Sequence, residues 1–259
     1  MPDPGPFDDW VPRDYLHEYY RALPPDEIEA IRYFVEGIRE AGKDSVLCFG
    51  CGPTLHHVFL AGPHMTALVL ADYLPRNLAE IAAWQSRDTD AHDWAPFVRY
   101  TLFCETGAEP TDEQIVERMT LIREGITGLV HGDAGLADPL GPTYRRQFGI
   151  VLSPFCADSA TDDRAVWARY CRNIASLVRP GGLFLTSALR RSRGYKVGPR
   201  FFPSANIDEN DLHAILAEDF RADTIEVEVR ELPAHRDQGY AGILLARARK
   251  AEAGDPNSK

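Results

Sequence analysis

The 259-residue chain has few lysines, no excess of basic residues and no long apolar run. Only four lysines occur, and 39 acidic residues outnumber 28 basic ones, which gives a formal net charge of −11. Nucleic-acid binding needs a basic face, so we expect no nucleic-acid partner. No apolar run approaches the ~20 residues that span a membrane, and residues 1–9 are acidic and proline-rich, unlike a signal peptide. We therefore expect a cytoplasmic protein with no membrane partner.

Cysteine is also scarce, and its five positions are scattered. An odd number without a regular spacing provides no disulfide framework, so we expect reduced thiols. Cys48 and Cys51 have the C-x-x-C spacing of redox sites, and His56 and His57 follow closely enough to suggest zinc. We expect neither, because Cys48 lies within a predicted strand and no second ligand pair is present. The sequence predicts no metal site.

Two common nucleotide-binding motifs are incomplete. A dinucleotide site has the pattern G-x-G-x-x-G, but Leu55 occupies the third glycine position, and no P-loop motif occurs. What is present is an apolar strand over residues 46–49, a turn with Gly50 and Gly52, and a second apolar run that ends in Asp72. Such a turn lets a ligand approach the main chain closely.

Asp72 follows the glycine turn at the end of the second predicted strand. An acid there, about twenty residues after the turn, can accept hydrogen bonds from both hydroxyls of a ribose. The turn offers no lysine to a phosphate, so the expected ligand carries a ribose without a pyrophosphate, and S-adenosylmethionine fits. The alternative is an ordinary α/β turn that binds no ligand.

Helical and strand patterns alternate along the chain. Helical spacing of apolar residues predicts helices over residues 13–23, 27–41, 55–60, 75–85, 92–106, 112–124, 164–178 and 208–218. Apolar runs predict strands over residues 46–49, 67–71, 126–130, 148–152, 183–188, 224–231 and 242–248. This order predicts an α/β fold with a mostly parallel sheet, and the last two strands predict an antiparallel edge hairpin. Asp26 is expected to cap the second helix, and residues 1–12 to be flexible.

Several short segments together resemble one enzyme family. They are D-Y-L-H-E-Y-Y (14–20), F-G-C-G-P-T (49–54), A-D-Y-L-P-R-N-L (71–78) and P-A-H (233–235). L-V-R-P-G-G-L-F-L-T-S (177–187) is similar to a signature of Rossmann-like methyltransferases. From about Pro12 to Arg249, the chain resembles the nicotinamide, phenylethanolamine and indolethylamine (thioether) N-methyltransferase family.

The resemblance implies a Rossmann-like methyltransferase fold with a seven-stranded sheet and helices on both faces. It implies a helical lid over residues 1–44 and a methyltransferase domain over residues 45–250, followed by a disordered tail over residues 251–259. S-adenosyl-L-methionine would be the cofactor and S-adenosyl-L-homocysteine the product. By analogy with the family, the cofactor-binding residues would be Tyr15, Tyr20, Gly50, Gly52, Thr54, Asp72, Asn77, Asp133, Ala134 and Ser153.

The implied reaction is methyl transfer to nitrogen of a small amine or aromatic heterocycle. Asp158 stands where amine-methylating members carry an acid, and it could take the proton of an ammonium acceptor. Its alternative role is to cap the next helix, a task that Thr161 or Asp162 could equally perform. Tyr20 is the second catalytic candidate. The implied acceptor-binding residues are Tyr20, Asp158, Ser187, Arg190, Tyr195 and His235.

The acceptor side departs from the family pattern. Arg190 replaces a second acid of the amine-specific members, and Ser187 replaces an acid of the nicotinamide type, so the acceptor is not specified. The basic stretch from Arg190 to Arg200 either binds an anionic acceptor or faces water. A methyltransferase acting on oxygen, sulfur or carbon, and a catalytically silent cofactor-binding homologue, remain alternatives. We expect a monomer or weak dimer.

Overall fold

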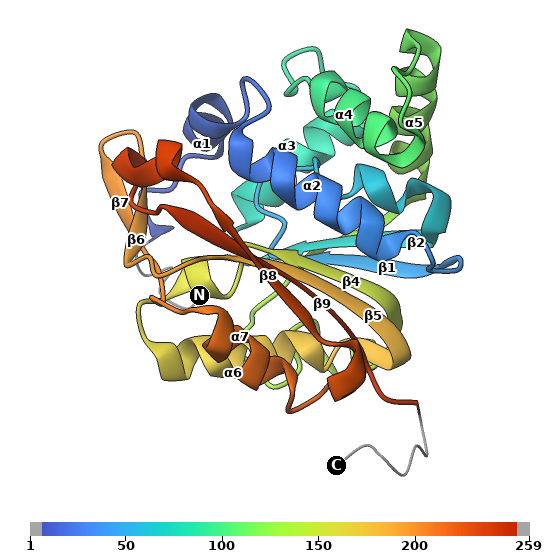
Figure 1. The fold of residues 1–259 in the computed structure, drawn as a ribbon. Coiled ribbons are helices and arrows are strands. Elements are labelled where there is room, and N and C mark those ends of the chain that lie inside the picture. The colour runs from blue at the N-terminus through green and yellow to red at the C-terminus, as the bar shows by residue number, and fades with distance from the viewer. Residues whose placement is uncertain (1–6, 253–259) are drawn as a thin grey trace.

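A seven-stranded sheet in the order β3-β2-β1-β4-β5-β9-β8 forms the centre of the computed structural model, which describes residues 7–252 (Figure 1). Strands β1 to β5 pair in parallel, β9 is antiparallel to β5, and β8 pairs with β9 as an antiparallel edge hairpin. The predicted sheet and edge hairpin are confirmed. The strands are β1 Asp44–Phe49, β2 Met65–Asp72, β3 Ile126–His131, β4 Phe148–Pro154, β5 Val178–Leu189, β8 Glu226–Glu231 and β9 Gly242–Arg249.

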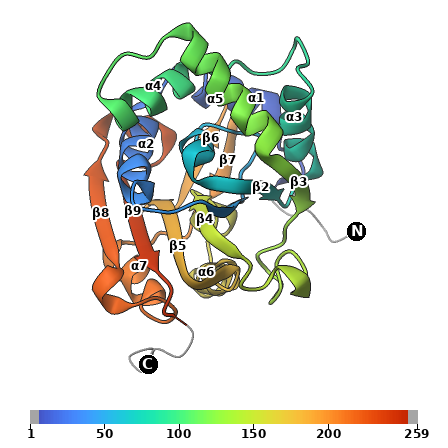
Figure 2. The same ribbon diagram turned by 90° about the vertical axis from the view of Figure 1, so that its right-hand side faces the viewer.

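Helices cover both faces of this sheet (Figures 1 and 2). Side chains alternate along a strand, so Val46 and Cys48 join one apolar cluster while Leu47 and Phe49 join the other. Helices α1 to α5 lie on the Val46 side, and α6 and α7 on the Leu47 side. The helices are α1 Pro12–Tyr19, α2 Pro25–Ile38, α3 Pro75–Gln85, α4 Ala95–Thr106, α5 Asp112–Gly125, α6 Arg164–Ala175 and α7 Glu209–Leu216.

The central strands β1 and β4 lie side by side, and the chain leaves them towards opposite edges of the sheet. In an open α/β sheet, ligands bind in the crevice that this reversal creates beyond the carboxyl ends of the strands. Gly50 and Pro154 lie at those ends and line one cleft. The topology therefore positions the glycine turn at the candidate site.

The helix predicted over residues 55–60 is wrong. Turns follow the glycine loop, and a 3-10 helix, η2, spans Phe59–His64. Pro53 and Pro63 bracket the segment, and Pro63 has no N–H to donate, so too few residues remain for a stable α-helix. His56 and His57 therefore lie in a turn, where both are buried.

The basic stretch after β5 is also more regular than expected. Strands β6 Gly194–Val197 and β7 Arg200–Pro203 form a separate antiparallel hairpin (Figure 1). Gly198, with φ of +57°, allows the turn between them. Val197 and Phe202, on one side of this hairpin, are buried. The alternation of apolar and polar residues in this short segment is a strand signal that the sequence analysis did not use.

Helix capping and the N-terminus give further corrections. Pro24, not Asp26, is the N-cap of α2, and Asp26 is buried. Asp163 caps α6, which excludes the three capping candidates of the sequence analysis. Trp10 is buried in the core, so the expected flexible segment does not extend to it. Residues 1–6 and 253–259, which include most of the predicted tail, lie outside the described residues.

Candidate active site

A cavity of about 510 Å³ lies beyond the carboxyl ends of the parallel strands. Ten of the predicted site residues line it, drawn from the N-terminal helix, the ends of β1 to β3 and the β6–β7 hairpin. They are Tyr15, Tyr20, Gly50, Gly52, Thr54, Asp72, Asn77, Asp133, Ala134 and Tyr195. The fold thus brings most of the predicted cofactor residues to one surface.

The glycine turn supports this cavity through its backbone conformation. Gly50 and Gly52 have φ of +69° and +59°, values that residues with a Cβ rarely adopt. A Cβ on Gly50 would lie 2.1 Å from Sγ of Cys156, whereas one on Gly52 would meet nothing within 4 Å. Gly50 is therefore required by packing as well as by φ, while Gly52 leaves the cavity open.

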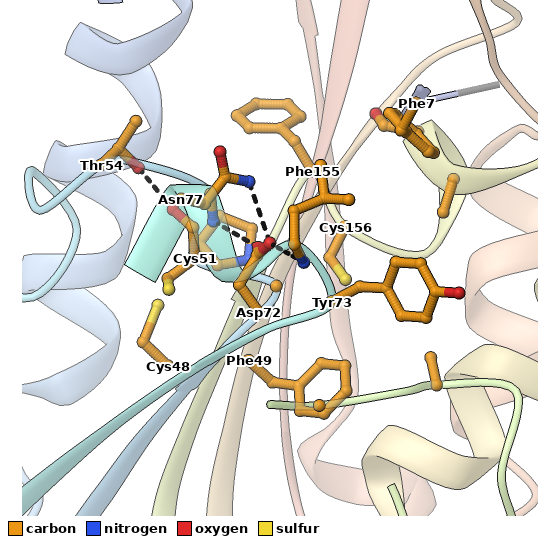
Figure 3. A pocket seen from close by; sticks show the side chains of 18 of the residues that line it. Phe7, Cys48, Phe49, Cys51, Thr54, Asp72, Tyr73, Asn77, Phe155 and Cys156 are labelled. Carbon is orange, nitrogen blue, oxygen red and sulfur yellow. Dashed lines mark hydrogen bonds between the residues drawn. The ribbon is translucent and has the colours of Figure 1, made fainter. Parts of the chain in front are cut away.

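Asp72 is buried beside the turn and accepts three hydrogen bonds (Figure 3). Its Oδ2 accepts from the main-chain N–H of Gly52 at 2.8 Å, and its Oδ1 accepts from Leu74 N–H and Asn77 Nδ2 at 2.9 Å each. Trp10 Nε1 donates to Oδ1 of Asn77 at 2.8 Å. Burial raises the pKa of Asp72, while these donors oppose the rise. The carboxylate is thus fixed in orientation by the loop, α3 and the N-terminal segment.

The opposite end of the cavity is formed by the loop after β3. Oδ1 of Asp133 accepts from the main-chain N–H of Gly135 at 2.7 Å, and Asn173 Nδ2 donates to the carbonyl of Ala134 at 2.7 Å. Tyr73 and Tyr170 supply aromatic surface nearby.

Near α1 the main cavity adjoins a smaller one of about 50 Å³. Tyr15, Tyr20 and Tyr195 line both, and Asp26 and Glu27 line only the smaller one. The remaining aromatic residues of the smaller cavity are Tyr19, Phe155 and Tyr240. Tyrosine rings and two buried carboxylates therefore surround one small space.

Glu27 forms the polar centre of this region together with two adjacent histidines. Tyr20 donates its hydroxyl to Oε1 of Glu27 at 3.1 Å. Nε2 of His56 lies 2.9 Å from Oε1, and Nε2 of His57 lies 2.7 Å from Oε2. The histidines hold the pKa of Glu27 below its usual range despite burial, and burial lowers the pKa of His56 to about 4. The sequence analysis missed Glu27, because nothing along the chain links it to residues 56 and 57.

Comparison with known proteins identifies the family of the chain. The sequence model of the NNMT/PNMT/TEMT family matches residues 6–251. The chain belongs to this family. Its family relatives include indolethylamine N-methyltransferase of Oryctolagus cuniculus, 27% identical over 78% of this chain and 79% of that one. Nicotinamide N-methyltransferase of Homo sapiens is 26% identical over 80% of each chain.

Solved structures show the same fold at low identity. A SAM-dependent methyltransferase from Methanosarcina mazei aligns with a TM-score of 0.55 and 13% identity, covering 90% of this chain and all of that one. The N-methyltransferase NodS from Bradyrhizobium japonicum aligns with a TM-score of 0.52 and 15% identity, covering 88% of this chain and 99% of that one. The expected family, the Rossmann-like fold and an S-adenosylmethionine-dependent methyltransferase are confirmed. Within residues 7–252, no helix is long and apolar enough to cross a membrane.

Three residues that were expected to bind the cofactor or the acceptor line neither cavity: Asp158, Ser153 and Ser187. Asp158 is buried away from the cavity lining, and its Oδ2 accepts from Leu189 N–H at 2.9 Å and from the hydroxyl of Ser159. Ser153 donates to the carbonyl of Phe49 beneath the lining, and Ser187 is buried in β5. Ser153 and Ser187 lie in strands that are covered on both faces, and Asp158 lies in the 3-10 helix η4 (Asp158–Ala160) after β4; none of the three lines either cavity.

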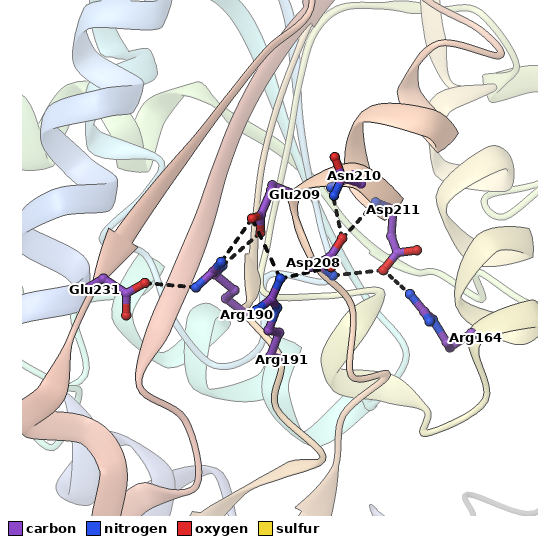
Figure 4. A network of polar contacts seen from close by, with 8 residues as sticks. All are labelled: Arg164, Arg190, Arg191, Asp208, Glu209, Asn210, Asp211 and Glu231. Carbon is purple, nitrogen blue, oxygen red and sulfur yellow. Dashed lines mark hydrogen bonds and ion pairs between the residues drawn. The ribbon is translucent and has the colours of Figure 1, made fainter.

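Arg190 forms ion pairs with two glutamates, Glu209 and Glu231 (Figure 4). Its Nε and Nη2 donate to Glu209 at 2.8 and 3.0 Å, and its Nη1 donates to Glu231 at 2.8 Å. Arg190 holds the pKa of Glu209 down at about 2. The expectation that Arg190 binds the acceptor stays a prediction: its charge is matched by partners from α7 and β8, and it does not line either cavity.

His235 and the cysteines also occupy structural positions. His235 stacks on Tyr240, whose hydroxyl donates to Asp26 at 2.9 Å, and the imidazole lies behind the smaller cavity rather than in its lining. Cys48 and Cys51 are both buried, and burial raises the pKa of both thiols. Thiols this reluctant to ionise are poor nucleophiles, which agrees with the rejection of a redox site.

Proposed function

We propose that the protein binds S-adenosylmethionine along the larger cavity and transfers its methyl group to nitrogen of a small cationic or aromatic amine in the smaller one. One observation carries the acceptor assignment: tyrosine rings and the buried carboxylate of Asp26 line the space next to the cofactor cavity. Aromatic faces and carboxylates both attract a nitrogen cation. Two relatives are named indolethylamine N-methyltransferase and nicotinamide N-methyltransferase, which supports an amine or an aromatic nitrogen as the acceptor.

The cofactor side fits a ribose-bearing ligand without phosphate. A carboxylate has about four acceptor positions, and three on Asp72 are occupied by protein donors. The one remaining acceptor position, whose direction is fixed by the three donors, would accept a hydrogen bond from a ribose hydroxyl. Asn77 would orient Asp72, Gly50 and Gly52 would admit the methionine part, and Asp133 with Ala134 would contact the adenine edge. The bound cofactor would supply an electrophilic methyl group on a sulfonium.

The protein's own contribution is alignment and exclusion of water, because methyl transfer is an in-line displacement. Residues 1–44 act as the lid in this proposal. Tyr19 donates its hydroxyl to the carbonyl of Lys196, and the hydroxyls of Tyr15 and Tyr20 lie 3.2 Å apart. The first contact holds α1 against the β6–β7 hairpin, and the second links α1 to the residue that follows it. The proposal includes a monomer or weak dimer.

Asp26 would replace Asp158 as the carboxylate that holds an ammonium acceptor. It lines the smaller cavity and receives the hydroxyl of Tyr240. Asp26→Asn keeps the shape and one hydrogen-bond acceptor but removes the charge. It should raise KM for a cationic amine at least tenfold and leave the affinity for S-adenosylhomocysteine unchanged. An equal KM would remove Asp26 from the acceptor site.

The overall proposal is tested in two steps. Calorimetric titration with S-adenosylhomocysteine should show one site per chain, and no binding by folded protein would defeat the cofactor assignment. Amines and aromatic nitrogen heterocycles are then screened with S-adenosylmethionine, and fragmentation of the product by mass spectrometry locates the methyl group. Methyl groups found on oxygen, sulfur or carbon would overturn the nitrogen assignment while leaving the cofactor assignment intact.

A further inference from the structure

We propose that Glu27, His56 and His57 form a binding site for a divalent transition-metal ion of the Zn²⁺ class, in the wall between the two cavities. One ligand atom from each residue lies within 4.8 Å of the others. The inference goes beyond methyl transfer and does not depend on it, because the three side chains converge whatever the acceptor is.

The second observation that supports a metal site is that these ligand atoms lack hydrogen-bond partners within the described part of the chain. Glu27 Oε2, His56 Nε2 and His57 Nε2 are buried, and none makes a hydrogen bond of acceptable geometry within the described part of the chain, although they approach to 2.7 and 2.9 Å. A buried polar group without a hydrogen bond destabilises the folded state, and a bound ion would remove that cost. Three ligand atoms without hydrogen bonds that lie within 4.8 Å of one another are close enough to share one ion.

The donor set selects the kind of ion. Two imidazole nitrogens and one carboxylate oxygen suit Zn²⁺, Fe²⁺ or Co²⁺ more than Mg²⁺ or Ca²⁺, which prefer oxygen ligands. Bonds of about 2.0–2.1 Å in a tetrahedral site separate ligand atoms by about 3.3 Å. The present separations, 2.7 Å from His57 Nε2 to Oε2 and 2.9 Å from His56 Nε2 to Oε1 of Glu27, are about half an ångström shorter than this.

The surroundings complete the site. Tyr20 donates to Oε1 of Glu27 and would orient the ligating carboxylate. Asp26, the neighbouring buried carboxylate, does not belong to the cluster and lines the smaller cavity. His56 and His57 both line the larger cavity. Three protein ligands leave a position open on that side, which a water molecule or a heteroatom of a substrate could occupy.

This arrangement differs from the zinc alternative considered from the sequence. Cys48 and Cys51 do not belong to the cluster among the described residues. The third ligand comes instead from the first turn of α2, which packs beside η2 and places Glu27 against the turn that carries both histidines.

Cobalt provides a direct test that needs no activity. Metal-free protein is titrated with Co²⁺ while visible absorption is followed. We expect one ion per chain and d–d bands whose intensity indicates four or five ligands with nitrogen among them. Glu27→Gln and His57→Ala should each weaken Co²⁺ binding at least tenfold. His213→Ala, an exposed histidine on α7, and Cys51→Ser should bind as the wild type does.

Circular dichroism of each variant establishes folding before the comparison is made. Folded wild type that shows no Co²⁺ band would overturn the proposal, as would equal binding by folded Glu27→Gln and His57→Ala. Loss of binding in Cys51→Ser would assign the metal to the other ligand set and would equally reject this one. Titration of metal-free protein with S-adenosylhomocysteine is a separate measurement, so failure of the metal site and failure of the proposed cofactor site are distinguishable.

Discussion

The main-chain N–H of Gly52 donates a 2.8 Å hydrogen bond to Oδ2 of Asp72. This contact ties the loop after β1 to the end of β2, two strands that pair in parallel. The same carboxylate is held by Asn77, which in turn is held by Trp10. The ribose-binding candidate is therefore preorganised by three parts of the chain, and its removal should affect ligand affinity more than a typical surface change.

Asp72→Ala should weaken S-adenosylhomocysteine binding by about 1.5–3 kcal/mol, or roughly 10- to 150-fold, because hydrogen bonds to a charged group are lost. Isothermal titration calorimetry measures the change. Asp163→Ala is a matched control, since it removes an exposed acid that caps α6 and does not line the cavity. The control should lose about 1 kcal/mol of stability and no affinity. Wild-type affinity in Asp72→Ala would exclude Asp72 from the cofactor site.

Gly50→Ala and Gly52→Ala should differ although both glycines have positive φ. A left-handed conformation costs a residue with a Cβ roughly 1–2 kcal/mol, which both variants would show. Only Gly50→Ala places its Cβ 2.1 Å from Sγ of Cys156, and overpacking adds about 1–3 kcal/mol. Urea denaturation of the two variants gives the comparison. Equal free energies of unfolding would contradict the tight contact between the loop and Cys156.

Asp158→Asn should remove a pH dependence of stability. Burial raises the pKa of Asp158 to about 6, above the value of about 3.9 expected in the unfolded chain. As pH rises from about 4 to 6, the unfolded state ionises first, so the native state loses on the order of 2–3 kcal/mol from this group. The variant lacks that loss.

The difference in unfolding free energy between Asp158→Asn and wild type should therefore grow in favour of the variant from pH 4 to 6 and stay constant above. Denaturation at four or five pH values measures it, and other titrating groups cancel in the difference. A difference that does not change with pH would show that Asp158 ionises normally in the folded protein.

Arg190→Ala should leave acceptor kinetics unchanged, including those of an acceptor that carries a carboxylate. Arg190 is already paired with Glu209 and Glu231, and an ion pair of this kind contributes about 0–1 kcal/mol. Steady-state KM and thermal unfolding are measured in parallel, with Glu209→Gln as the matched variant. If KM rises only for the anionic acceptor, Arg190 binds substrate and the structural assignment is wrong.

The sequence by itself determined the architecture and the cofactor side. Apolar runs such as residues 46–49 specify buried strands, and Gly50, Gly52 and Asp72 mark the loop and the strand end, because these signals are local. These residues follow the carboxyl ends of β1 and β2, and because the two strands pair in parallel, their carboxyl ends lie side by side. The same logic failed where local signals conflict, as at Pro53 and Pro63, which prevent a helix over residues 55–60.

Tertiary structure decided the acceptor side. Glu27 meets His56 and His57, and Asp26 meets Tyr240, because α2 packs over the sheet with its first turn directed at the glycine loop. Arg190 finds Glu209 and Glu231 from two later elements. Periodicity specifies which face of an element is buried, but it carries no information about which polar side chains meet across elements, since that depends on how the helices pack.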